Sequence, residues 1–367
     1  MPKAKYKTIL ENILKKISEG KLLPGNRIES IREMCEHYAV SPIVALRVFK
    51  ELAETGKVER RDGEGYFVKL PAPPGQGNKI ISLFRPSRDY NRWDNLGNRI
   101  NDGILSATQM NHLHLIIPGS TVFMKGKIPS DQEVRMMAEE IGEFRNAVGI
   151  VADMRITDEQ LHKYILPAAG GTPVAVIGRS SQLPHVLSCS FPYEAVGRDA
   201  AKLALTGKPE YIFHFPDKGF PDSHIMTKAF TDYLKKQNFP EDKVLIRNGY
   251  GILPREECYR MFEEIMRCAH RSPGRVFVFC TVDTTAEAIR SYCNMTQDAV
   301  YAGKDYSLIG FGGYEVVKTR PDRTATFEVD FSTLGSEAVR LLIECKTNLD
   351  QTSVTIPYKL SLNETIG

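Results

Sequence analysis

Two helix-start signals between residues 22 and 70 constrain the fold of this chain more than any other feature. Ser30 precedes an apolar run and Glu33 follows it by three residues, which is the capping-box pattern that begins a short helix. Ser41 and Pro42 form a second start, because serine favours the N-cap and proline favours the first helical position. Two short helices joined by a tight turn predict a helix-turn-helix.

The apolar residues of this stretch recur at helical spacing and predict its buried faces. The first face holds Ile31, Met34, Cys35 and Tyr38, and the second holds Ala45, Val48, Phe49 and Leu52. A further amphipathic helix is expected over 6–18, and residues 58–60 and 65–68 alternate as strands around the turn Asp62-Gly63. A hairpin directly after a helix-turn-helix predicts a winged helix, whose second helix enters the major groove of DNA.

Residues 22–70 resemble the winged-helix domain of the GntR family of bacterial transcription regulators. The chain departs from the family at Glu29, where proline is usual, and at residues 42–44, where arginine and threonine are usual. The resemblance therefore implies the fold and DNA binding, and it does not imply which base is read. The matching positions, in order and at the family's spacing, are Leu23-Pro24-Gly25, Arg27, Ser30 to Glu33, Val40-Ser41, Leu52, Gly56 and Gly63 to Val68.

The residues that contact DNA are expected on the second helix and on the hairpin. Free N–H groups at the start of this helix favour a phosphate, and Arg47 and Lys50 lie outside its buried stripe. Arg32 stands where the family uses an arginine for DNA. Ile43 and Val44 either contact thymine methyl groups or pack inside, and the hairpin is either a DNA contact or a solvated surface. The candidates for DNA contact are Arg32, Ser41, Pro42, Ile43, Val44, Arg47, Lys50, Arg60, Arg61 and Gly63.

The charge of the chain is unevenly distributed. Residues 1–70 hold 14 Lys and Arg against 10 Asp and Glu, a net charge of +4, and residues 71–367 hold 34 against 35, a net charge of −1. The excess positive charge coincides with the predicted DNA-binding segment. The next eight residues, PAPPGQGN, predict a linker over 71–78. We therefore expect a winged-helix DNA-binding domain at 1–70 and a second domain at 79–367.

A chain of 367 residues with 42% hydrophobic and 25% charged residues is expected to form two or three globular domains. No apolar window is long enough for a membrane span, and the basic N-terminus lacks the apolar run of a secretion signal. The seven cysteines are scattered and form no CxxC pair, which is typical of reduced thiols. We expect a cytoplasmic protein with no membrane partner.

From residue 79 onward, short apolar runs alternate with amphipathic helices. Strands are expected at 80–84, 113–117, 148–151, 173–177, 211–215, 244–247, 276–280 and 307–310, and helices at 94–109, 130–144, 158–168, 194–206, 222–237, 255–269 and 284–294. Two runs of this alternation predict an α/β fold of two lobes with parallel sheets. Ligands of such sheets bind beyond the carboxyl ends of the strands, here between the lobes.

This arrangement resembles the periplasmic-binding-protein-like domain of LacI-type repressors. The matching runs are 173–177, 281–286 and 308–313, and the segment 326–338 also fits. Gly312-Gly313 replaces the family's acidic pair, and the expected arginine near 222–228 is absent, with His224 the nearest polar residue. A winged helix joined to such a domain is the architecture of the arabinose-responsive GntR repressors. The resemblance implies a homodimer formed through the large domain and a small sugar, sugar phosphate or other derivative bound between the lobes.

The loop RPSRDYNRWD, residues 85–94, follows the first strand of the larger domain and offers the groups of a sugar site. Such sites combine an aromatic ring, on whose face the sugar packs, with carboxylate, amide and arginine groups that bind its hydroxyls. Trp93 is the only tryptophan, and a lone tryptophan is more often part of a core or an interface than of a binding site. Asp283 matches a position that often binds ligand in the LacI-type family. The expected ligand-binding residues are Arg85, Asp89, Tyr90, Asn91, Arg92, Trp93, Asp153, His224 and Asp283, with Ser120 and Arg179 as weaker candidates.

No enzyme signature of the GxSxG, GxxxxGK[ST] or HExxH type occurs, and no metal or cofactor is expected. The sequence predicts a ligand-responsive transcription regulator, in the simplest case a repressor of a carbohydrate-utilisation operon, that binds double-stranded operator DNA as a homodimer. One alternative is a DNA-binding regulator whose second domain serves only dimerisation or a partner. Another is an α/β enzyme with an appended regulatory domain.

Overall fold

The computed structural model describes residues 5–18, 21–22, 25–54, 58–61, 65–68, 78–84, 96–121, 128–144, 147–217, 222–247, 255–314, 323–345 and 353–366. Packing divides the chain into two compact units, the first ending at Gly77 and the second containing most of the chain from Asn78 onward. Apart from Asn78, the predicted linker 71–78 lies outside the described residues.

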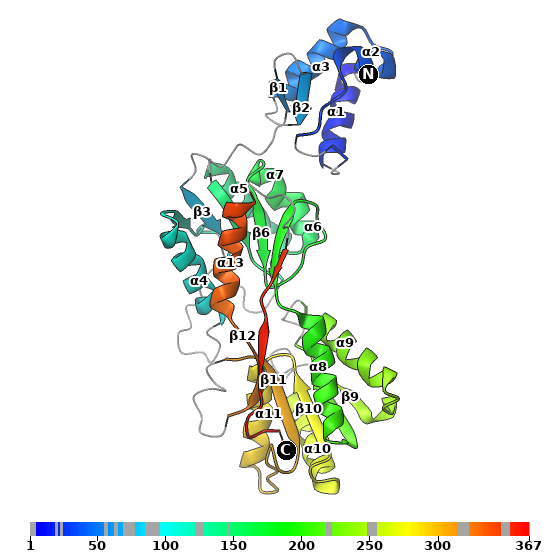
Figure 1. Ribbon diagram of the computed structural model, residues 1–367, viewed down its shortest axis with the longest axis vertical. Coiled ribbons are helices and arrows are strands. Elements are labelled where there is room, and N and C mark those ends of the chain that lie inside the picture. Colours follow the sequence, from blue (N-terminus) through cyan, green and yellow to red (C-terminus); the bar gives the residue numbers. More distant parts are fainter. Residues whose placement is uncertain are drawn as a thin grey trace. The chain divides into compact units, whose positions relative to one another are not determined.

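The first unit contains three helices followed by a two-stranded sheet (Figure 1). Its elements are α1 (Lys5–Ser18), α2 (Ile31–Tyr38), α3 (Pro42–Glu54), β1 (Val58–Arg61) and β2 (Gly65–Val68). The two strands run antiparallel, with Val58 opposite Val68 and Arg61 opposite Gly65. The predicted winged helix is confirmed, with the hairpin β1–β2 as its wing.

Sequence signals account for the local structure of the first unit. The Ser30 hydroxyl accepts a hydrogen bond from the Glu33 backbone N–H at 3.2 Å, and the Glu33 carboxylate accepts one from the Ser30 N–H at 2.6 Å. Met34 and the predicted stripe of α3 are fully buried in one hydrophobic core. From this stripe, Phe49 stacks on Tyr66 of β2 with 4.2 Å between ring centroids. The core therefore fixes the wing to the helices.

The second unit contains two six-stranded sheets, each the centre of one lobe. The first sheet is built from β3 (Lys79–Ser82), β4 (His114–Ile116), β5 (Ala147–Ala152), β6 (Val174–Ile177), β7 (Val186–Ser190) and β13 (Ser353–Thr355). Its order is β13-β7-β6-β5-β3-β4, and every pair is parallel. The strands β7 and β13 were not predicted from the sequence.

The second sheet is built from β8 (Tyr211–Phe215), β9 (Val244–Ile246), β10 (Val276–Cys280), β11 (Ser307–Gly312), β12 (Ala325–Val329) and β14 (Tyr358–Ser361). Its order is β14-β12-β11-β10-β8-β9. All pairs are parallel except β12–β14, which is antiparallel. The predicted α/β fold of two parallel-sheet lobes is confirmed, with this one antiparallel edge strand added.

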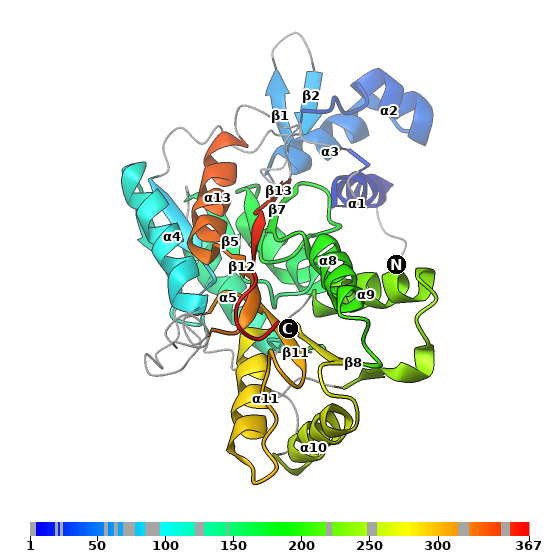
Figure 2. The ribbon, with the colours of Figure 1, turned by 60° about the horizontal axis from the view of Figure 1, so that its bottom comes forward.

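Helices connect the strands and cover the sheets, as Figure 2 shows from a second direction. The helices of the second unit are α4 (Leu96–Met110), α5 (Asp131–Glu143), α6 (Asp158–Gln160), α7 (Leu166–Ala169), α8 (Tyr193–Thr206), α9 (Ser223–Lys236), α10 (Arg255–Arg271), α11 (Asp283–Met295) and α13 (Phe331–Glu344). A π-helical turn at Leu161–Ile165 joins α6 to α7, where one regular helix was expected, and a 3₁₀ turn lies at Glu241–Lys243.

The chain crosses between the lobes three times, after β7, after β12 and after β13. The sequence pattern suggested one lobe for each half of the domain, which is wrong for α13 and β13, since both belong to the first lobe. α13 lies against α4 (Figure 1), and the two backbones nearly touch. A Cβ added at Gly335 of α13 would lie 2.2 Å from the Ile100 carbonyl oxygen of α4. Contacts this distant in the sequence leave no local signal.

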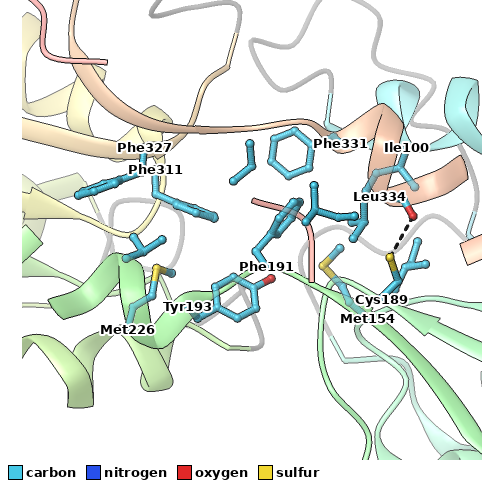
Figure 3. Close-up of a cluster of buried hydrophobic side chains, with 14 of the residues drawn as sticks. Ile100, Met154, Cys189, Phe191, Tyr193, Met226, Phe311, Phe327, Phe331 and Leu334 are labelled. Atoms are coloured by element: carbon cyan, nitrogen blue, oxygen red, sulfur yellow. Dashed lines mark hydrogen bonds between the residues drawn. The ribbon is translucent and has the colours of Figure 1, made fainter. Parts of the chain in front are cut away.

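One hydrophobic core runs through both lobes of the second unit. Its centre is an aromatic cluster at the crossings, where the ring of Phe191 lies 6.0 Å from Phe311 and 5.4 Å from Phe331, edge to face (Figure 3). Phe191 follows β7 of the first lobe, Phe311 lies in β11 of the second, and Phe331 begins α13. The lobes are therefore joined by packed side chains as well as by the crossing strands.

Candidate functional site

Five of the ten predicted DNA-contacting residues are exposed on α3 or directly before it. Ser41, Pro42, Ile43, Arg47 and Lys50 are exposed, whereas Val44 is half-buried. Ile43 has an exposed fraction of 78%, so it does not pack inside the unit. Leu46, which the sequence reasoning missed, is also exposed at 48%. On α2, the Arg32 side chain is 89% exposed and forms an ion pair with Glu36 of the same helix, at 3.1 Å.

Arg47 differs from the other candidates because its guanidinium contacts α1. Its Nη2 donates a hydrogen bond to the Tyr6 hydroxyl at 3.1 Å, and its Cζ lies 4.0 Å from the centre of the Tyr6 ring. The Nε atom pairs with Glu51 at 3.2 Å. These contacts connect α3 to α1 and give Arg47 a structural role within the unit.

The wing carries the predicted arginines of the hairpin. Arg60 is exposed, and Arg61 pairs with Glu59 at 2.9 Å while its guanidinium covers the Phe67 ring at 4.4 Å. Gly63 lies outside the described residues. Arg27 forms an antiparallel bridge to Phe67 and thus adds a third segment beside the wing.

In the second unit, residues that follow the carboxyl ends of strands in one lobe contact residues of the other lobe. The Tyr193 hydroxyl at the start of α8 donates a hydrogen bond of 2.5 Å to the carbonyl oxygen of Gly178, which follows β6. Burial raises the pKa of Tyr193 well above its usual value, so the phenol remains a donor. Arg99 of α4 donates to the Gly313 carbonyl oxygen beyond β11, at 3.4 Å. The carboxyl edges of the two sheets therefore face one another.

Asp283 lies at this boundary, at the start of α11, but its side chain is fully buried. The carboxylate accepts hydrogen bonds from the Tyr314 N–H at 2.9 Å and the Thr326 hydroxyl at 2.7 Å. A Cβ on Gly310 would lie 2.1 Å from Asp283 Oδ1, so only glycine fits there. Burial raises the pKa of Asp283 to about 7, and the hydrogen bonds partly oppose this shift. The hydrogen bond from Tyr314 to Asp283 holds the segment after β11 in place.

Asp153 and Arg179, two further candidates, also form bonds inside the first lobe. Asp153, just past β5, is fully buried and accepts bonds from Arg155 Nε at 2.8 Å and Nη2 at 2.6 Å. Arg179, just past β6, donates to the Ile156 carbonyl oxygen at 2.6 Å and to Asp158 at 2.7 Å. Both residues therefore shape the loops at the carboxyl edge of the first sheet.

The remaining described candidates differ in exposure. His224, in the first turn of α9, is exposed. Beside it, Asp222 is buried, and this burial raises its pKa although the charges of His224 and Arg179 oppose the shift. The Ser120 hydroxyl beyond β4 is buried and has no hydrogen-bond partner among the described residues, while its backbone N–H donates to Glu140 at 2.7 Å. Asp222 was not predicted as a site residue.

The loop candidates Arg85, Asp89, Tyr90, Asn91, Arg92 and Trp93 lie outside the described residues.

Within the described ranges, no helix combines the length and the apolar character needed to cross a bilayer. The same ranges hold no group of three or more His, Cys, Asp or Glu side chains placed to bind a metal ion. The described cysteines are free thiols, namely Cys35, Cys189, Cys268, Cys280, Cys293 and Cys345.

Comparison with protein families identifies the first unit. Residues 5–68 match the family of bacterial regulatory proteins named gntR. The N-terminal unit is a gntR-family helix-turn-helix domain. An uncharacterized HTH-type transcriptional regulator of Bacillus subtilis, YhcF, is 35% identical over 63 residues, which are 17% of this chain. The chain spans about half, 52%, of the length of that relative.

Comparison with solved structures covers the second unit, which is similar in fold to LacI-family regulators. The transcription regulator CcpA of Lactococcus lactis has a TM-score of 0.62 at 15% identity, covering 80% of this chain and all of that one. A LacI family regulator from Enterococcus faecium with bound ribose has a TM-score of 0.60 at 13% identity, covering 78% and 98%. The regulator CelR in complex with cellobiose has a TM-score of 0.62 at 14% identity, covering 89% and 91%. At these identities the likeness shows the fold.

Proposed function

We propose that this protein is a DNA-binding transcription regulator whose second unit binds a small polar effector, a sugar or sugar derivative. One observation carries the proposal, namely that a gntR-family winged helix precedes a two-lobed parallel α/β unit with the fold of LacI-family regulators. The similar proteins are regulators by name, and two of the structures hold a sugar, cellobiose or ribose. The proposed role needs no catalytic step and places the protein in the cytoplasm.

On the DNA side, α3 would lie in the major groove and the wing beside the sugar–phosphate backbone. The exposed Lys50 and Arg60, and Arg32 at 89% exposure, provide cations for phosphate or base edges. A homodimer would place two such units on a palindromic operator, because a two-fold protein reads two half-sites. The exposed start of α3, at Ser41 and Pro42, fits a phosphate contact.

On the effector side, the ligand would bind at the boundary where the carboxyl edges of the two sheets face each other. The contact from Tyr193 to Gly178 crosses this boundary, so a ligand bound there would change how tightly the lobes close. The exposed His224 and the segment 85–94 would supply direct contacts. Asp153 and Asp283 are buried in bonds within the chain, so they would act by holding the loops that contact the ligand.

The proposal is tested by titrating the full-length protein against the DNA upstream of its own gene, with fluorescence anisotropy as the readout. We expect binding that survives an excess of unrelated duplex and weakens steeply as salt rises, because phosphate contacts release counterions. A scrambled duplex of the same composition is the control. Equal binding to both duplexes would refute sequence-specific regulation.

The buried state of Asp153, Arg179 and Asp283 favours a second candidate, in which the second unit serves only dimerisation or a partner protein. Thermal unfolding in the presence of a panel of sugars and sugar phosphates separates the two candidates, because a ligand that binds the folded state raises the unfolding temperature. A saturable rise for at least one compound supports the effector role. No rise for any compound supports the dimerisation role.

A further inference from the structure

The solvent-exposed side of α3 carries two large apolar side chains that take no part in the core. Ile43 and Leu46 are 78% and 48% exposed, and neither belongs to the hydrophobic core of the first unit. They stand three residues apart, and the exposed Lys50 follows seven residues after Ile43, so the three share one side of the helix. Ile43 and Leu46 together form what we call the apolar stripe of α3.

Neighbouring contacts show which direction the stripe faces. On one side of α3, Arg47 contacts Tyr6 of α1, and on the other side Phe49 stacks on Tyr66 of the wing. The stripe lies between these two contacts, on the surface that a groove-binding helix turns toward DNA. Arg47 follows Ile43 by one helical turn and therefore lies beside the stripe, where its guanidinium contacts Tyr6 and Glu51.

The surroundings of the stripe favour DNA as its occupant. Residues 1–70 carry a net charge of +4, and Arg32, Lys50 and Arg60 are exposed in the same unit. A basic surface of this kind attracts a polyanion. In the major groove, the 5-methyl group of thymine is the apolar feature of a base edge, and aliphatic side chains contact it. An aliphatic stripe on a basic winged helix therefore matches thymine.

We infer that Ile43 and Leu46 read thymine methyl groups, so that each operator half-site contains thymines where these residues meet the major groove. The inference rests on the proposed function and adds the chemical class of base that α3 recognises. Arg47 then acts as a positioning residue, which holds α3 against α1 through Tyr6. Specific binding comes from methyl contacts in the first half of α3, with the exposed cations around them.

The inference is tested on the operator found in the upstream DNA, by replacing its thymines with deoxyuridine one position at a time. Deoxyuridine keeps every hydrogen-bonding group and lacks only the methyl. We expect about a fourfold loss of affinity at one or more positions of each half-site, which is the effect of exposing one buried methyl group. Thymines outside the half-sites serve as internal controls.

Two variants assign the methyl contacts to the stripe. Ile43→Ala and Leu46→Ala should bind the parent operator more weakly and should lose sensitivity to deoxyuridine at the position that each residue contacts. Met295→Ala is the matched control, since Met295 is 85% exposed on α11 of the second unit. Circular dichroism and thermal unfolding of each variant verify that the winged helix is folded.

The outcomes separate this inference from the proposed function. Tight, sequence-specific binding that is insensitive to every deoxyuridine substitution overturns the inference and leaves the proposed function standing. Sensitivity that persists in both alanine variants also overturns it, because other residues would then read the methyl groups. If the alanine variants bind DNA like the parent but change their oligomeric state, the stripe is a protein–protein contact and the inference is overturned. Absence of specific binding to any DNA overturns the proposed function itself.

Discussion

Replacing Gly335 with alanine tests the close packing of α13 against α4. Through this packing the C-terminal part of the chain returns to the first lobe. An added Cβ would lie 2.2 Å from the Ile100 carbonyl oxygen and 2.9 Å from the Ile104 nitrogen. Both are backbone atoms, so no side chain can turn away. Ordinary contact begins near 3.4 Å, so the two helices must separate by roughly 1 Å.

The magnitude follows from two opposing effects. Overpacking a well-packed contact costs about 1–3 kcal/mol. Alanine in a helix interior is favoured over glycine by about 0.5–1 kcal/mol. We therefore expect Gly335→Ala to lower the free energy of unfolding of the second unit by about 1–2 kcal/mol.

Urea unfolding of the full-length protein measures this change, with the fluorescence of Trp93 as a readout, since the single tryptophan belongs to the second unit in sequence. Gly142→Ala is the control, because Gly142 lies in α5 and a Cβ there would meet nothing within 4 Å. That variant should be more stable than the parent by about 0.5–1 kcal/mol. If Gly335→Ala were as stable as Gly142→Ala, the close approach of α4 and α13 would be refuted.

Three further predictions concern the candidate sites. Arg32→Ala should weaken operator binding without changing the unfolding temperature. Arg47→Ala should weaken operator binding and also destabilise the first unit by about 1 kcal/mol, because it loses its contacts with α1. Fluorescence anisotropy measures the binding, and calorimetry measures the stability. Tyr193→Phe should lower the stability of the second unit by about 1–3 kcal/mol, since it leaves a carbonyl oxygen at the lobe boundary without its donor; the exposed Tyr301→Phe is the control in urea unfolding. Asp283→Asn should change how stability depends on pH, as measured by urea unfolding between pH 4 and pH 8.

The sign of this last effect follows from the raised pKa of Asp283. The folded state holds the proton up to about pH 7, while the unfolded chain releases it near its usual value of 3.8. The folded parent therefore loses stability as pH rises from about 4 to about 7, by a few kcal/mol. Asparagine does not titrate, so the stability of the variant relative to the parent should rise across this window. A constant difference between the two would contradict a raised pKa.

For the other two predictions, the contradicting results are equally specific. An unchanged unfolding temperature for Arg47→Ala would show that its contacts with Tyr6 do not support the first unit. Equal stabilities of Tyr193→Phe and Tyr301→Phe would remove the hydrogen bond to Gly178 as a link between the lobes.

The local structure of this fold could be predicted from the sequence because its signals are local. The capping box at Ser30 and the proline at residue 42 set the starts of α2 and α3, and both starts were predicted. The strand β7 was missed because Val186–Ser190 is short and contains two serines and a cysteine, so it has few of the β-branched and aromatic side chains that mark a strand, although all five residues are buried. The return of α13 to the first lobe was missed because it depends on contacts with α4, more than two hundred residues earlier.

The candidate sites were less predictable, since tertiary packing decides what a side chain can contact. Spacing alone placed Arg47 on the exposed side of α3, but its position relative to Tyr6 of α1 depends on how the helices pack. Asp283 stood at the expected strand end, and its burial depends on Gly310 and Thr326 of neighbouring strands. Leu46 was missed because an isolated leucine in a helix is normally assigned to the core.

The most direct test of the account is the operator affinity of the full-length protein, measured at fixed salt while sugars and sugar phosphates are titrated. We expect specific binding to the upstream duplex and a saturable change in that affinity with at least one compound, because an effector that prefers one lobe closure shifts the population of DNA-binding dimers. An affinity that no compound alters, together with equal binding to operator and scrambled DNA, would contradict a ligand-responsive regulator.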